Sequence, residues 1–188
     1  MDKIEPFLKN KDTFLLCHYF YKEINNFESF IQSKDKPGNF DESFFQNVSD
    51  IDQLIKYGYH TSSIEFCLKY DMIDDLVVFD KLNQEARWSP FEWGYKPEYL
   101  DLLSFTGFFG AIKCFKFLLI KGLEINDNVT CMVVCSGCFE LFHLCEGQRF
   151  VTPKAVCKAS AFFHLSLLVF MLENGAMINA KDDCIEFC

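Results

Sequence analysis

Gly110-Ala-Ile-Lys-Cys-Phe-Lys-Phe-Leu-Leu-Ile-Lys-Gly-Leu-Glu-Ile-Asn126 occurs again, without a gap, as Phe163-His-Leu-Ser-Leu-Leu-Val-Phe-Met-Leu-Glu-Asn-Gly-Ala-Met-Ile-Asn179. The two copies lie 53 residues apart, which leaves room for a third copy between them. Ser136-Gly137-Cys-Phe-Glu-Leu-Phe-His-Leu-Cys-Glu146 fills that interval. Repetition at a period of roughly 20–50 residues is typical of stacked helical units that bury their apolar faces against their neighbours. The pattern predicts an all-α helical-repeat solenoid.

The repeated segment resembles the end of an ankyrin repeat, Gly-His-x-x-x-Val-x-x-Leu-Leu-x-x-Gly-Ala-x-x-Asn. The positions that match in the first copy are Gly110, Phe115, Leu118, Leu119, Gly122 and Asn126, and those in the last are Leu168, Met171, Leu172, Gly175, Ala176 and Asn179. More narrowly, Trp88-Ser-Pro-Phe-Glu-Trp93 and Val133-Val-Cys-Ser-Gly look like segments of the divergent ankyrin proteins expanded in parasitic protozoa. The resemblance covers residues 45–183. It implies a protein interaction module whose turns and inner helices form a concave binding face.

Departures from the ankyrin pattern are concentrated in the first helix of each unit and in the middle copy. Thr106-Gly107 stands where the pattern has two alanines, and only Thr152-Pro153 keeps the usual opening. The middle copy loses its terminal Gly-Ala-x-x-Asn, where Gly147-Gln148-Arg149 intervenes. The packing between neighbouring first helices is therefore expected to differ from that of regular repeats.

The repeat register divides the chain into two regions. Residues 1–97 are expected to form a divergent helical region with degenerate units, one of them ending at Gly58. Within it, residues 83–97 are expected to be an ordered, Trp- and Pro-containing insertion packed on the stack, although an exposed Trp there would mark a binding spot. Residues 98–188 are expected to hold ankyrin-like units at about 98–126, 127–150 and 151–183. Ser62 and Glu65 have the spacing of a capping box that opens a helix.

Charge and hydropathy narrow the classes of partner. The chain has 18 Lys and Arg against 27 Asp and Glu, a formal charge of −9. This balance argues against nucleic acid, whose affinity depends on cationic contacts with phosphate, and favours a protein partner, a basic one in particular. No signal-peptide pattern is seen at the start, and no apolar run reaches the 18–20 or so residues that span a bilayer. A cytoplasmic protein without membrane contact is expected.

Ten cysteines raise an alternative from another class. Without a secretion signal they are expected to be reduced thiols. Cys131, Cys135 and Cys138 have the i, i+4, i+7 spacing of one helical face, with His143 and Cys145 just beyond, which suggests a zinc-binding or redox-responsive regulator. The second ligand pair of common zinc sites is missing, and buried cysteines that behave as small apolar residues are the favoured interpretation.

Motifs for catalysis or for cofactor binding are not found, so the chain is predicted to be a non-catalytic scaffold without cofactor or metal. The candidate partner-binding residues follow the unit-ending glycines, and they are Glu124, Asp127, Asn128, Lys181 and Asp182. Asn126 and Asn179 are interpreted instead as turn residues that satisfy their own backbone. Because a solenoid needs a polar terminal unit and no polar unit follows Asn179, the array is expected either to continue or to self-associate through its C-terminal repeat.

Overall fold

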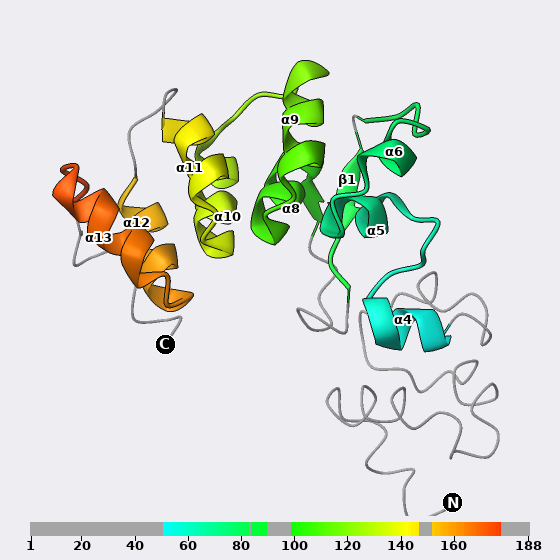
Figure 1. The fold of residues 1–188 in the computed structure, drawn as a ribbon, viewed down its shortest axis with the longest axis horizontal. Helices are drawn as coiled ribbons and strands as arrows, with labels where there is room; N and C mark the ends of the chain where they lie inside the picture. The colour runs from blue at the N-terminus through cyan, green and yellow to red at the C-terminus, as the bar shows by residue number, and fades with distance from the viewer. Residues whose placement is uncertain (1–50, 83, 90–98, 147–151, 178–188) are drawn as a thin grey trace, which may run out of the picture. The chain divides into compact units, whose positions relative to one another are not determined.

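The computed structural model describes residues 51–82, 84–89, 99–146 and 152–177 (Figure 1). Helices dominate these residues, which confirms the prediction of a mainly helical chain. The helices expected before residue 51 lie outside the described residues. By their contacts the described residues form two compact units. One comprises residues 51–66, 87–89 and 99, and the other comprises residues 67–82, 84–86, 100–146 and 152–177.

The first unit contains α4 (Ile51–Tyr57), which ends at Gly58. Gly58 has a φ of 81°, a left-handed conformation that glycine adopts without steric cost, and it directly follows the helix. The expectation that a repeat unit ends at Gly58 stays a prediction. Trp88 is 3% exposed, and the backbone N–H of Ser89 donates to the Tyr59 hydroxyl at 2.8 Å. The part of the insertion that is described is therefore ordered, and Trp88 is not the exposed binding spot considered above.

The predicted capping box is wrong by one residue. The helix α5 (Ile64–Lys69) begins after Ser63, whose hydroxyl accepts from the backbone N–H of Phe66 at 3.2 Å. The Glu65 carboxylate does not turn back to the start of the helix but accepts from the backbone N–H of Arg87 at 3.3 Å. Serine therefore caps the helix as expected, while the glutamate ties α5 to the insertion.

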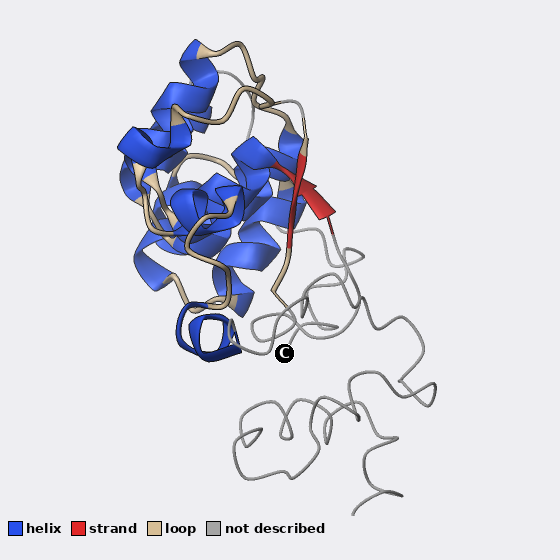
Figure 2. Cartoon of the chain, turned by 90° about the vertical axis from the view of Figure 1, so that its right-hand side faces the viewer, coloured by secondary structure: helices blue, strands red, loops and turns tan. Residues whose placement is uncertain are grey.

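Two short strands were not predicted. β1 (Glu85–Arg87) and β2 (Tyr99–Asp101) pair into a two-stranded sheet, seen in red in Figure 2. Each strand has only three residues, too few for the alternation of apolar and polar side chains that would reveal it in the sequence. The purely helical expectation is corrected at these residues.

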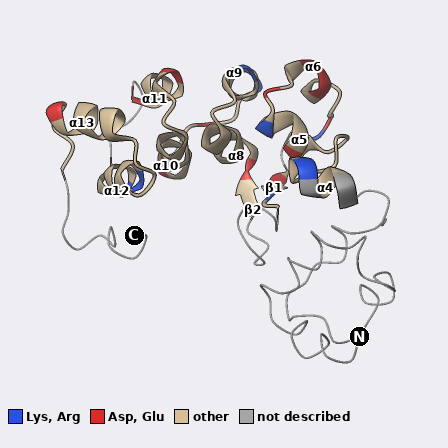
Figure 3. Cartoon of the chain, turned by 60° about the horizontal axis from the view of Figure 1, so that its bottom comes forward, with Lys and Arg blue, Asp and Glu red and all other residues tan. Residues whose placement is uncertain are grey.

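The second unit contains three successive helix pairs in two rows (Figure 3). α10 packs on both α8 and α12 in one row, while α9 contacts α11 and ring contacts join α11 to α13 in the other. The bounds of the six helices are α8 (Leu102–Phe109), α9 (Ile112–Ile120), α10 (Asp127–Ser136), α11 (Phe139–Glu146), α12 (Pro153–Ala161) and α13 (Leu165–Glu173).

The first helix of each pair starts at a side-chain cap, and two of the three end at a left-handed glycine. Asp101, Asn126 and Thr152 accept from the backbone N–H three residues further on, at 2.8, 3.0 and 3.3 Å. Gly110 and Gly137 follow α8 and α10 with φ values of 68° and 69°. These caps stop each helix after two to three turns and so allow its partner to fold back beside it.

Gly107 lies within α8. A glycine is needed there because α10 approaches closely, and not because the backbone has a positive φ. A Cβ atom at this position would lie 2.7 Å from Cγ2 of Val133 on α10. Gly110, by contrast, follows α8 with a positive φ. The large rings of Phe105, Phe115 and Phe142 are fully buried in the core of this unit.

The short helix α6 (Ile73–Leu76) is linked to α9 through Asp71. Asp71 has a φ of 55°, in the left-handed region where two of the helix pairs carry glycine. Its carboxylate accepts from the backbone N–H groups of Lys113 and Cys114 at 3.2 and 2.8 Å. Since Ala111 offers no side-chain cap, Asp71 satisfies donors at the start of α9 from another element.

Candidate interaction surface

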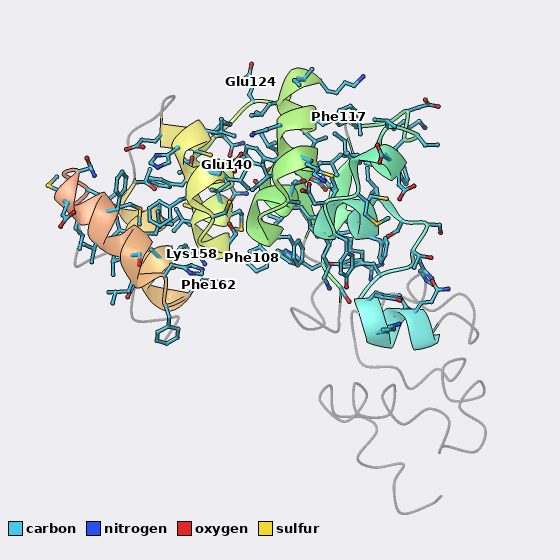
Figure 4. All side chains as sticks on the ribbon, viewed as in Figure 1. Phe108, Phe117, Glu124, Glu140, Lys158 and Phe162 are labelled. Carbon is cyan, nitrogen blue, oxygen red and sulfur yellow. The ribbon has the colours of Figure 1, made fainter. Side chains whose placement is uncertain are left out.

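The segment between α9 and α10 carries the central pair of candidate binding residues. Glu124 is exposed on this connector, and Figure 4 shows it beside the end of α9. Asp127 is the first residue of α10 and is also exposed. A carboxylate in the first turn of a helix is stabilised by the backbone N–H groups there. Glu124 therefore has the clearer case as a contact residue, because Asp127 also serves the helix.

Asn128 and Asn126 are used inside the fold. The amide of Asn128 donates from Nδ2 to the Ser104 hydroxyl at 3.2 Å, and the residue is half-buried. This bond ties α10 to α8, and the proposed role of Asn128 in partner binding stays a prediction. Asn126 caps α10, as expected of a turn residue. Lys181, Asp182 and Asn179 lie outside the described residues, and their proposed roles stay predictions.

The three cysteines of the zinc hypothesis do not share a helical face. Cys131 and Cys135 are buried on α10, but the helix ends at Ser136 and Gly137 turns left-handed, which places Cys138 in the following turn. Within the described part of the chain, no group of three or more His, Cys, Asp or Glu side chains is arranged to hold a metal ion. The i+7 spacing was misleading because a glycine ends the helix within it.

Burial favours the protonated form of these thiols. It raises the pKa of Cys135 to about 12 and that of Cys145 to about 11. Burial and the neighbouring Asp71 carboxylate together raise the pKa of Cys114 to about 12. Six described cysteines, Cys67, Cys114, Cys131, Cys135, Cys138 and Cys145, are free thiols, as expected of reduced cysteines.

Thiol labelling should follow this burial. Because the thiolate is the reactive species, Cys135 and Cys145 are expected to react with iodoacetamide at pH 8 at least about 100-fold more slowly in the folded protein than in urea. Cys138, which is half-buried, is expected to show less than about tenfold protection. Peptide mass mapping of timed reactions measures each rate. Equal rates at Cys135 and Cys138 in the folded protein would contradict the buried-thiol interpretation and restore a redox role.

His164 connects the last helix pair to the middle one. It precedes α13, and its Nε2 lies 2.7 Å from the backbone carbonyl oxygen of Cys135 near the end of α10. A carbonyl can only accept, so Nε2 carries the hydrogen. The ring also lies against Gly137, where a Cβ atom would come within 2.5 Å of Nδ1. His164 therefore serves the packing of the last helix pair on the middle one.

A surface pocket of about 550 Å³ lies between the segment that follows α6 and the end of α9. We call it the α6–α9 pocket. Its walls combine apolar side chains with two lysines, an aspartate and a glutamine, and they are Val77, Phe79, Asp80, Lys81, Leu82, Gln84, Phe117, Lys121 and Leu123. This site was not predicted from the sequence, because its two walls are about 40 residues apart in the chain. The only signal was the matching register of the two segments in the repeat.

One side of α13 is apolar and open. Leu165, Val169 and Leu172 have the i, i+4, i+7 spacing of one helical face and are all exposed. In the repeat register Val169 corresponds to Lys116 of α9, whose ammonium bonds the Glu140 carboxylate of α11 at 2.6 Å. The open face of α13 is thus the one that α9 turns toward its next neighbour.

Comparisons of the chain with protein-family models, with curated proteins and with solved structures found no match. Across the described residues, no helix is both long enough and apolar enough to cross a bilayer. Function is therefore inferred from the fold and from the chemistry of its surface.

Proposed function

We propose that this chain is an ankyrin-type helical-repeat module that binds another protein and does not catalyse a reaction. The observation that carries the proposal is the sequential packing of the helix pairs, with α10 between α8 and α12. In such a stack each unit buries its apolar face against its neighbours and leaves the connecting segments exposed. Extended surfaces of this kind are used for binding.

Local features at corresponding positions support the repeat interpretation. Gly110 and Gly137 occupy the same place in two units and share the same left-handed conformation. Gly122 and Gly175, at the ends of α9 and α13, form a second matching pair with φ values of 93° and 87°. The same backbone conformation at corresponding positions favours a structural unit that is repeated along the chain.

The binding surface that we propose includes the connector between α9 and α10, where Glu124 and Asp127 are exposed. Two carboxylates within four residues, on a chain with a formal charge of −9, favour a basic partner segment. Cytoplasmic location belongs to the same proposal.

Affinity capture from lysate of the source cells tests the module. Glu124→Lys combined with Asp127→Asn removes negative charge from the connector. It does so without placing a positive charge at the start of α10. Glu173→Lys, a charge reversal on the exposed end of α13, is the matched control. We expect a protein partner that is captured by the parent and the control and is lost with the connector variant, all three having the same circular dichroism spectrum.

Each other result has a defined meaning. A partner that survives the connector variant would show that the binding surface lies elsewhere on the module. Recovery of the chain alone would contradict binding of a different protein and would favour self-association through the open face of α13. Sedimentation of the Val169→Lys variant, which places a charge in that face, would then separate a dimer from a monomer.

A further inference from the structure

The α6–α9 pocket has the size and the lining of a ligand site. Its volume of about 550 Å³ falls within the usual range of roughly 300–1,000 Å³. Phe79, Phe117 and Leu123 supply apolar walls from both sides. In Figure 4, Phe117 lies on the side of α9 that faces α6. All the lining residues belong to one compact unit, so the walls are held by the packing of α6 on α9.

The charge of the pocket is opposite to that of the chain. Lys81 and Lys121 line it with a single carboxylate, Asp80, on a protein whose formal charge is −9. Neither lysine forms an ion pair with another described residue. The ammonium of Lys121 lies 5.3 Å from the centre of the Phe117 ring. A cation is thereby placed directly beside the apolar wall, where a ligand that touches Phe117 also meets positive charge.

Exposed apolar side chains stand next to pocket-lining residues in the sequence. Val77 lines it and is 55% exposed, and its neighbour Val78 is 77% exposed. Ile120, adjacent in sequence to Lys121, is 83% exposed. An extended peptide can contact the apolar walls and the lysines together, whereas a small anion would contact the lysines alone.

We propose that the α6–α9 pocket binds an acidic peptide segment of a protein partner, in which a large apolar side chain is flanked by carboxylates. The apolar side chain inserts between Phe79, Phe117 and Leu123, and the carboxylates pair with Lys81 and Lys121. This proposal rests on the module being a protein binder, and it adds a second surface with chemistry opposite to that of the Glu124 connector. The pairing of an apolar anchor with a charged rim is the usual composition of a binding hot spot.

Fluorescence anisotropy with short labelled peptides tests the pocket in the full chain. The acidic probe is Glu-Asp-Phe-Leu-Asp-Glu, and the two comparison probes are Lys-Lys-Phe-Leu-Lys-Lys and Glu-Asp-Ser-Ser-Asp-Glu. The protein variants are Lys81→Glu with Lys121→Glu, and the control Lys154→Glu, which reverses an exposed lysine on α12. Inorganic phosphate at millimolar concentration serves as a competing anion.

The acidic apolar probe is expected to bind the parent and the Lys154→Glu control equally, and to lose at least about tenfold in affinity in the double variant. Its affinity should also fall with added salt. Equal binding of the Ser-containing probe, or full competition by phosphate, would overturn the apolar anchor and leave an anion site. Tighter binding of the lysine probe to the parent would overturn the charge assignment.

Failure of the pocket is distinguishable from failure of the module. If no probe binds, while lysate capture still yields a partner that the double lysine variant retains, the pocket proposal is overturned and the module stands. If the acidic probe binds as expected but capture yields no other protein, the pocket binds acidic apolar peptides. The proposed function of the chain as a protein-binding module is then wrong.

Discussion

Gly137→Ala is expected to lower the free energy of unfolding by about 2–5 kcal/mol. The methyl group forces a residue with a side chain into a left-handed φ of 69°, at a cost of roughly 1–2 kcal/mol. It also collides with the His164 ring, which lies 2.5 Å from the new Cβ position, and overpacking of this kind costs about 1–3 kcal/mol. Urea denaturation followed by circular dichroism measures the loss.

Gly110→Ala separates these two causes. Gly110 has nearly the same φ, 68°, but the closest atom to its added Cβ would be the Ser136 Cβ at 3.5 Å. Its substitution should therefore cost only the conformational part, about 1–2 kcal/mol. The gain in stability from a stiffer unfolded chain is common to both variants and cancels in their difference.

Introducing Gly137→Ala into the His164→Ala variant completes a double-mutant cycle. With the ring removed, Gly137→Ala should lower the free energy of unfolding by no more than Gly110→Ala does. His164→Ala by itself loses the hydrogen bond to the Cys135 carbonyl, which is worth about 1–3 kcal/mol when no water replaces it. A coupling energy of about 1–3 kcal/mol between Gly137 and His164 is expected. Strict additivity of the two substitutions would show that the ring does not contact a side chain at position 137.

Features whose sequence signal is local and repeated could be predicted. Gly58 was marked as the end of a unit and Asn126 as a turn residue, and both lie at helix boundaries in the structure. A left-handed turn and a side-chain cap each depend on one residue and its immediate neighbours. The mainly helical character followed from the same periodic segments. The cysteine spacing failed because it was extended past Gly137, the residue that ends the helix.

Features that depend on distant residues could not be predicted. The strand Glu85–Arg87 exists through its pairing with β2, and Asp71 caps α9 from more than 40 residues away in the chain. The hydrogen bond between Asn128 and Ser104 likewise joins residues of two neighbouring helix pairs. The α6–α9 pocket also depends on residues that are distant in the chain. Each of its walls alone has the sequence of an ordinary loop or helix end.

Phe115→Ala is expected to lower the free energy of unfolding by about 3–5 kcal/mol, the usual cost of deleting a fully buried aromatic ring. The ring of Phe115 packs toward Gly107, with its Cε2 3.4 Å from where a Cβ atom of that glycine would lie, so its removal leaves a cavity between α8 and α9. Thermal and urea unfolding of the variant measure the loss. A cost below about 1 kcal/mol would mean that α8 and α9 close over the cavity, and the stack would be more plastic than its packing implies.

Phe117→Ala is the matched substitution two residues further along α9. Phe117 is half-buried and lines the α6–α9 pocket, so its removal should cost only about 1–2 kcal/mol, in proportion to the smaller apolar area that it buries. The acidic apolar probe should nevertheless bind this folded variant at least about tenfold more weakly. One helix would then carry its stability on Phe115 and its recognition on Phe117. Unchanged probe binding by Phe117→Ala would contradict that division, because the apolar wall would have no part in recognition.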